Sequence, residues 1–133
     1  MSFNSQICTT REQSERLLSL GLKKETADMT WQNFAMTEEY EDWKAVVVEE
    51  WDDWCNNDIP AWSLHRLWDI LPKDVEVDDD RYVTSHLEGE KAIVYHDYGS
   101  HYYNFDKNNI YDNIVNCIEW LIKEGYFNKE YLN

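Results

Sequence analysis

The chain has few of the features that mark membrane-spanning or secreted proteins. The longest apolar runs, such as Ala45–Val48, contain only four residues, whereas a membrane-spanning helix needs roughly 20 apolar residues. The first eight residues contain neither a basic stretch nor a long apolar segment, and a secretory signal requires both. The sequence therefore predicts a cytoplasmic protein that does not enter membranes.

Cysteine, proline and glycine are also scarce. The three cysteines, Cys8, Cys55 and Cys117, are odd in number and form no CxxC pair, which favours reduced thiols over a disulfide framework. Only two prolines and four glycines occur, while 43% of the residues are apolar and 15% are aromatic. Disordered chains lack this apolar content. We therefore expect a single compact domain over residues 1–133, a length typical of one domain.

Basic residues are outnumbered, 12 against 27 acidic ones, which gives a net charge of −15. Nucleic-acid binding needs a basic surface, so this class is excluded, and anionic membranes are disfavoured. The charge is concentrated. Residues 38–80 contain fifteen acidic and three basic residues, a net charge of −12. A surface of this kind attracts basic partners.

Apolar spacing and turn residues predict the secondary structure. Two capping boxes, Thr9 with Glu12 or Thr10 with Gln13, begin a first helix. Pro60 suits the first turn of a second helix, and Pro72 ends it. Residues 43–51 have a β-branched centre and favour a strand, although a helix competes. The remaining predicted elements are strands at about 81–87, 91–97 and 101–105 and a helix at about 109–125.

Together these elements predict an α+β fold. Its small antiparallel sheet is a three-strand meander with residues 43–51 as a candidate fourth strand, packed against about three helices. Two-residue turns starting at Gly89 and Gly99 would fix the register of the meander. The resulting pairs are Val83 opposite His96, Leu87 opposite Ala92, and Val94 opposite Phe105.

Histidines provide one candidate site. In this register His96 and His101 share a face and lie diagonally across one hairpin. With a carboxylate such as Asp106 they could bind a metal ion. The spacing specifies no third ligand, and HExxH is absent, so two partly exposed histidines are the competing interpretation. A small metal- or ligand-binding, hydrolase-like domain centred on His96 and His101 is the alternative function.

Catalytic motifs are otherwise absent. The sequence contains neither a GxSxG nucleophile elbow nor a glycine-rich phosphate loop, and pairs of carboxylates are inevitable in so acidic a chain. The sequence therefore favours a protein without enzymatic activity and without a cofactor.

Tryptophan and acidic residues coincide in the middle of the chain. Six of the seven tryptophans lie between Trp31 and Trp68, and tryptophan is a frequent anchor at protein interfaces. Core packing is the competing interpretation, and it is favoured for Trp62 and Trp68. The leading hypothesis is an accessory or protein-interaction protein that docks a basic protein surface, whereas the oligomeric state is not determined by the sequence. The candidate binding residues are Glu49, Glu50, Trp51, Asp52, Asp53 and Trp54.

One resemblance is carried by five short stretches, residues 12–14, 20–22, 26–29, 59–64 and 120–125. Together they resemble a family of small proteins from gut bacteria of the Bacteroides type and from their phages and mobile elements. The family has no assigned activity, so the resemblance implies a cytoplasmic accessory protein and no catalytic or binding residue. Residues 38–54 match the family least.

Overall fold

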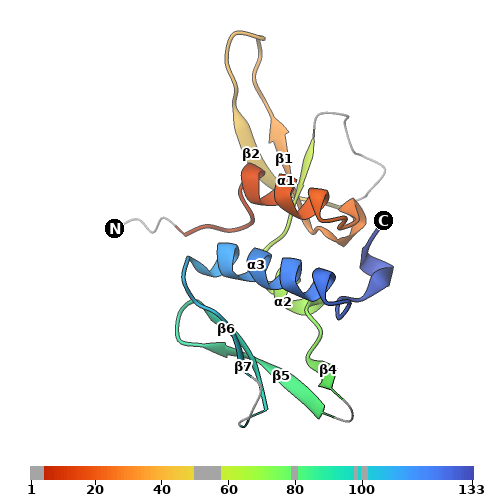
Figure 1. Cartoon of the computed structure of the whole chain (residues 1–133). Helices are drawn as coiled ribbons and strands as arrows, with labels where there is room; N and C mark the ends of the chain where they lie inside the picture. Colours follow the sequence, from red (N-terminus) through yellow and green to blue (C-terminus); the bar gives the residue numbers. More distant parts are fainter. Residues whose placement is uncertain (1–4, 50–57, 79–80, 98, 100–101) are drawn as a thin grey trace. The chain divides into compact units, whose positions relative to one another are not determined.

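A computed structural model describes residues 5–49, 58–78, 81–97, 99 and 102–133. It contains three α-helices and two antiparallel sheets among these residues (Figure 1), which confirms the predicted α+β class. Contacts group the chain into two compact units. The first unit is residues 1–67 with Asn133, and the second unit is residues 68–132. The single domain over residues 1–133 stays a prediction.

The first unit begins with helix α1 (Arg11–Ser19). Of the two predicted capping boxes, the second one forms. The Gln13 amide donates to Thr10 Oγ1 at 3.1 Å, and the Thr10 amide donates to Gln13 Oε1 at 2.9 Å. These bonds satisfy amide groups that a helix start leaves without partners. After α1 the chain turns through Gly21, whose φ of 103° suits glycine, into the 3₁₀ turn η1 (Lys24–Thr26).

The sheet of the first unit has the strand order β2-β1-β3. Strand β2 (Trp43–Val47) confirms the prediction of a strand in this region. Strand β1 (Met29–Asn33) lies in a stretch without apolar period and was not predicted. It is the central strand of the sheet. Its backbone pairs with both β2 and β3, and this pairing makes it a strand although its sequence has no strand period.

The predicted second helix begins too early. Residues 59–61 form strand β3 (Ile59–Ala61), and helix α2 (Leu64–Ile70) starts only after Ser63. The Ser63 side chain accepts a bond from the Arg66 amide at 3.2 Å, as a helix cap does. Pro60 therefore lies in an edge strand, where proline is tolerated, and the helix ends just before Pro72 as predicted.

The core of the first unit confirms the burial predicted for Trp62. This side chain is fully buried, and its indole nitrogen donates to Thr26 Oγ1 at 2.9 Å. Trp31 packs against a smaller buried cluster, and its indole nitrogen donates to the backbone oxygen of Thr9 at 2.9 Å. The members of that cluster are Cys8, Met29 and Ala61.

The second unit contains a four-stranded meander covered by one helix. Its order is β4-β5-β6-β7, so the three predicted strands are present. Its fourth strand is the unpredicted β4, whereas the strand at 43–47 belongs to the other sheet. The bounds are β4 (Asp74–Asp78), β5 (Arg81–Glu88), β6 (Ala92–His96), β7 (Tyr102–Phe105) and α3 (Ile110–Lys123).

The predicted register of this meander is wrong by one residue at both turns. Thr84 pairs with His96, and Ile93 pairs with Phe105. The first connection has three residues, Gly89 to Lys91, instead of two. A shift of one residue turns a strand over. Strand β6 therefore turns Ile93 and Tyr95, instead of Val94 and His96, toward the face that α3 covers.

Helix α3 supplies the apolar layer over this sheet, as its predicted stripe requires. Ile114, Cys117, Ile118 and Leu121 are fully buried. The ring of Trp120 lies 4.7–5.9 Å from the ring centroids of Tyr95, Tyr103, Phe105 and Tyr126. Tyr126, which follows α3, thus packs against this helix, and Phe127 is buried as well.

Candidate functional site

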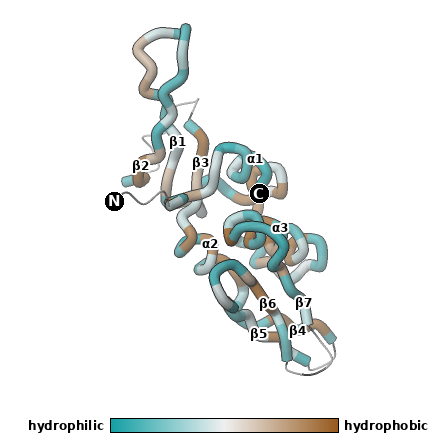
Figure 2. Tube along the Cα trace, turned by 90° about the vertical axis from the view of Figure 1, so that its left-hand side faces the viewer, coloured by the Kyte–Doolittle hydropathy of each residue, from teal (hydrophilic) through white to brown (hydrophobic). Residues whose placement is uncertain are grey.

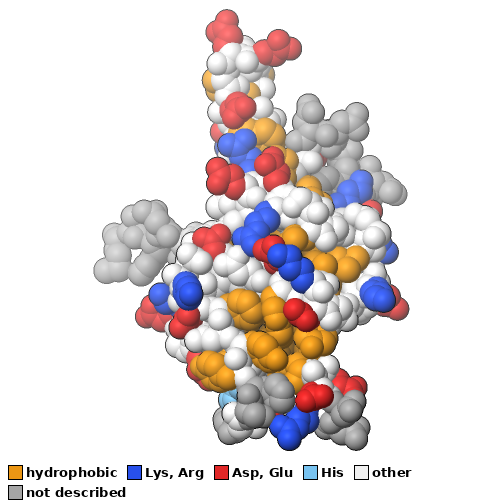
Figure 3. All heavy atoms as spheres, viewed as in Figure 1, with side chains coloured by type: hydrophobic (Ala, Val, Ile, Leu, Met, Phe, Trp, Pro, Cys, Tyr) orange, Lys and Arg blue, Asp and Glu red, His pale blue; other side chains and the backbone are white. Residues whose placement is uncertain are grey.

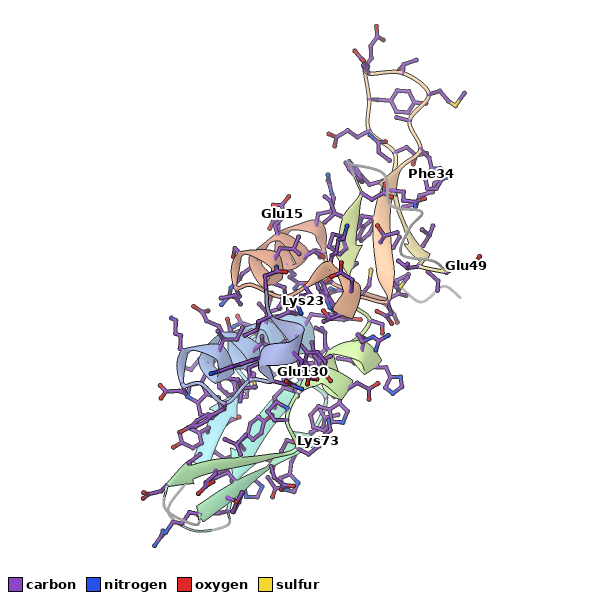
Figure 4. All side chains as sticks on the ribbon, turned by 90° about the vertical axis from the view of Figure 1, so that its right-hand side faces the viewer. Glu15, Lys23, Phe34, Glu49, Lys73 and Glu130 are labelled. Atoms are coloured by element: carbon purple, nitrogen blue, oxygen red, sulfur yellow. The ribbon has the colours of Figure 1, made fainter. Side chains whose placement is uncertain are left out.

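The predicted acidic site falls mostly outside the described residues. Glu49 is exposed and follows β2 (Figure 4). Glu50, Trp51, Asp52, Asp53 and Trp54 belong to residues 50–57, which the structure does not describe. Their grouping into one binding surface therefore stays a prediction.

The histidine site is described in part. His96 is 6% exposed, on the face of the second sheet opposite to the one α3 covers. Its ring centroid lies 4.5 Å from that of His86, and its Nε2 lies 3.8 Å from Glu88 Oε1. His101 lies outside the described residues. Among the residues that are described, no three His, Cys, Asp or Glu side chains form a group that could hold a metal ion. His86, Glu88 and Tyr102 are among the described neighbours of His96.

Acidic and apolar side chains gather instead on the connection between β1 and β2, residues 34–42, which we call the arm. In Figures 1 and 4 the arm extends away from α1 and β3, which belong to the same unit. Three large apolar side chains are exposed on it, Phe34 (46%), Met36 (88%) and Tyr40 (53%). The arm also contains four acidic residues and no basic one. These are Glu38, Glu39, Glu41 and Asp42.

The arm has the polarity pattern of a contact surface. Figure 2 colours most of it hydrophilic, interrupted by a more hydrophobic stretch, and Figure 3 shows acidic side chains at its end with hydrophobic ones beside them. Single exposed apolar residues are common on protein surfaces. Three large ones on nine residues, interleaved with four carboxylates, are a concentration that neither solubility nor core packing requires.

Hydrogen bonds fix the base of the arm. The Phe34 amide donates to the Asp42 backbone oxygen at 2.8 Å, which continues the ladder of β1 and β2. Asn33 Oδ1 accepts bonds from the amides of Ala35 and Asp42 at 3.0 and 2.9 Å. One side chain thus ties both strands of the arm together where they leave the sheet.

Charges and rings orient the side chains around this base. The guanidinium of Arg11 lies 4.8 Å from the ring centroid of Trp43, and the Trp43 indole nitrogen donates to Glu41 at 3.1 Å. Lys44 Nζ lies 3.6 Å from the Asp42 carboxylate and 5.7 Å from the ring centroid of Phe34. Arg11 also lies 3.7 Å from the Glu41 carboxylate, so two cations lie at the base of the arm, each beside one of its carboxylates.

The sequence did not predict this site, because the predicted apolar interface residues were tryptophans and the exposed apolar residues of the arm are Phe34, Met36 and Tyr40. The acidic residues of the arm were counted in the charge of residues 38–80, but the exposure of Phe34, Met36 and Tyr40 cannot be read from apolar content alone. One signal was available. A stretch without helix or strand period that nevertheless contains large apolar residues, directly before a strand, is typical of an exposed connection.

Two general observations complete the description. No helix among the described residues is long and apolar enough to cross a membrane. Comparison of the chain with models of protein families, with curated proteins and with solved structures found no match.

Proposed function

We propose that this chain is a non-enzymatic interaction protein that docks a basic protein surface through the arm. The observation that carries the proposal is the arrangement of exposed Phe34, Met36 and Tyr40 among four carboxylates, in a stretch that contains no Lys or Arg of its own. The proposal keeps the predicted class of function and moves its centre from residues 49–54 to residues 34–42.

Each kind of side chain has a distinct part in binding. Large apolar side chains that enter pockets on a partner supply most of the binding free energy at protein interfaces. Carboxylates around them raise the rate of encounter with a basic surface and select against acidic partners. The arm combines both, and it would repel the phosphates of nucleic acid.

The fixed base favours binding for a further reason. A loop that becomes ordered on association loses conformational entropy, which lowers affinity. Asn33 already fixes the base of the arm in the free protein, so less entropy is lost when a partner binds. Glu49 is exposed beyond the other end of β2 and adds one carboxylate at that end of the strand. Residues 50–54 and an accessory role in a bacterial or phage cytoplasm, as the resemblance implies, remain part of the proposal.

The test is capture of partners from host lysate by the tagged protein at about 50 and 300 mM salt, read by mass spectrometry. Two variants probe the arm, Met36→Ser/Tyr40→Ser for the apolar anchors and Glu38→Gln/Glu39→Gln for the charge. The matched control is Glu15→Gln/Glu130→Gln, which removes the same charge from exposed positions outside the arm.

We expect the wild type and the control to retain basic proteins at low salt. The anchor variant should lose them at both salt concentrations, and the charge variant should weaken their capture chiefly at low salt, where charges are less screened. A set of captured proteins that is identical for the wild type and both arm variants would overturn the proposal.

A further inference from the structure

We propose that the open edge of β2 binds an extended basic segment of the partner as an added strand. The inference rests on the proposed function and specifies how the partner is held. Strand addition is an established mode of recognition, in which backbone hydrogen bonds supply affinity and alternate side chains supply specificity.

The hydrogen bonds of the hairpin show which backbone groups are available. The Phe34 amide donates to the Asp42 oxygen, and the Val48 amide donates to the Asp28 oxygen. In an antiparallel ladder, residues in hydrogen-bonded pairs alternate with residues whose N–H and C=O groups point the other way. On β2 the alternate residues are Trp43, Ala45 and Val47. Their backbone groups therefore point away from β1, on the side where the described sheet has no further strand.

Two other sheet edges carry features that prevent such pairing. Pro60 lies in edge strand β3 opposite Thr30, at a position whose amide would point outward, and proline has no amide hydrogen to offer. Edge strand β4 has an irregular register between Glu76 and Asp78, and bulges of this kind protect edges. Strand β2 has a continuous register and no proline. Edge strand β7 shares both properties, so the acidic arm beside β2 is what distinguishes this edge.

The charge around β2 selects the occupant. The stretch from the arm through Glu49 contains five acidic residues and one basic residue, Lys44, which already lies 3.6 Å from Asp42. A strand with lysine or arginine at alternate positions would place cations near these carboxylates. Val47, 68% exposed at the end of β2, offers an apolar contact for a β-branched residue between those cations.

The probe is a capped seven-residue peptide that alternates valine with lysine and arginine, labelled for fluorescence anisotropy and added to the full chain. Its counterpart has the same sequence with N-methyl groups on alternate amides. Methylation removes donors without changing charge. We expect the unmodified peptide to bind and the methylated one to bind at least tenfold more weakly. Equal affinities would overturn the inference, because charge alone would then explain the binding.

The matched protein variants are Ala45→Pro and Ala45→Ser. Proline removes an outward amide that makes no bond to β1, whereas serine keeps that amide. Loss of at least tenfold in peptide affinity with proline alone supports strand addition. The methylated peptide keeps the test decisive if the proline variant unfolds, since it leaves the protein unchanged.

The outcomes separate the two proposals. If Ala45→Pro folds and still captures the lysate partners that the Met36→Ser/Tyr40→Ser variant loses, the arm docks without strand addition and only the inference fails. If no variant changes the captured set, the proposed function fails. Concentration-dependent dimerisation of the wild type that Ala45→Pro abolishes would overturn the inference in a different way, because a second copy would then occupy the edge.

Discussion

The two sheets of this protein differ in what packs against them and in the loop that extends from one of them. The four-stranded sheet places Tyr95, Tyr103 and Phe105 against Trp120 of α3, and its edge strand β4 is irregular. The three-stranded sheet packs a small cluster around Met29, continues into the exposed arm and ends in the regular edge of β2. The four-stranded sheet also exposes Tyr82, Leu87 and Tyr102, so the two sheets differ chiefly in the arm, where exposed apolar residues lie among carboxylates.

This difference supports the arm as the proposed binding surface. Covered apolar surface stabilises the fold, whereas exposed apolar surface beside open backbone groups lowers solubility unless a partner uses it. The acidic residues of the arm also reduce the risk of self-association, because like charges repel when two copies approach. Substitutions in the two units should therefore separate stability from binding.

Truncation of the core of the second unit should give the largest effect. Ile118 on α3 is fully buried, so Ile118→Ala removes apolar contacts and leaves a cavity. We expect the free energy of unfolding to fall by about 2–5 kcal/mol, measured by urea denaturation followed by circular dichroism. Ile118→Val, which removes one methylene group, should cost about 0.5–1.5 kcal/mol. A loss below the valine value for the alanine variant would contradict the packing described for α3.

The rates of thiol labelling at Cys8 and Cys117 should show which of the two units opens more readily. Burial, and to a lesser extent the nearby charge of Asp28, raises the pKa of Cys8 in the first unit to about 11. At pH 8 the thiolate fraction of Cys8 would then be about 100-fold below that of a thiol with its ordinary pKa. We expect correspondingly slow reaction with iodoacetamide in the native protein and fast reaction in urea, read by peptide mass spectrometry.

Cys117 is the internal control in the second unit, where burial also raises the pKa of the thiol. We expect Cys8 to be labelled before Cys117, because the cluster around Cys8 is smaller. The raised pKa of Cys8 also predicts that stability falls above about pH 9, where the unfolded chain releases a proton that the folded chain retains. Native labelling of Cys8 at the rate of a free thiol would contradict its burial.

Loss of the cap of α1 should give a moderate effect. Thr10→Ala removes the hydroxyl that accepts from the Gln13 amide, and loss of such caps costs about 1 kcal/mol. Thr10→Ser retains the hydroxyl and should change stability by less than half as much in the same urea titration. Equal losses in the two variants would show that the methyl group of Thr10, and not its hydrogen bond, stabilises the helix start.

The cap is also an example of what could be predicted from sequence. The start of α1 and the position of α3 depend on residues close together in the chain, and those predictions hold. The register failed because a connection of three residues in place of two is decided by the backbone at Gly89, whose φ is 63°. Strand β4 could have been predicted, because Val75 and Val77 alternate with Asp74, Glu76 and Asp78 as in a half-buried strand.

The candidate site could be predicted only in its chemistry. Charge counting placed the acidic field in the middle third of the chain, but the exposure of Phe34, Met36 and Tyr40 results from tertiary structure, since β1 has no periodic pattern to mark where the arm begins. Pro60 shows the same limit. Its preference for a helix start was outweighed by pairing of β3 with β1, a contact between residues almost thirty positions apart.

The smallest effect on stability should come from the most exposed apolar residue of the arm. Met36 is 88% exposed, so Met36→Ala should change the free energy of unfolding by no more than about 0.5 kcal/mol, far less than Ile118→Ala. The same variant should nevertheless weaken capture of a partner, because Met36 contributes contact area only when a partner covers it. A loss of stability above about 1 kcal/mol would show that Met36 packs within its own unit. In that case Met36 would not be available as a binding residue of the arm. The acidic residues beside the open edge of β2 would then be the main remaining difference between the two sheets.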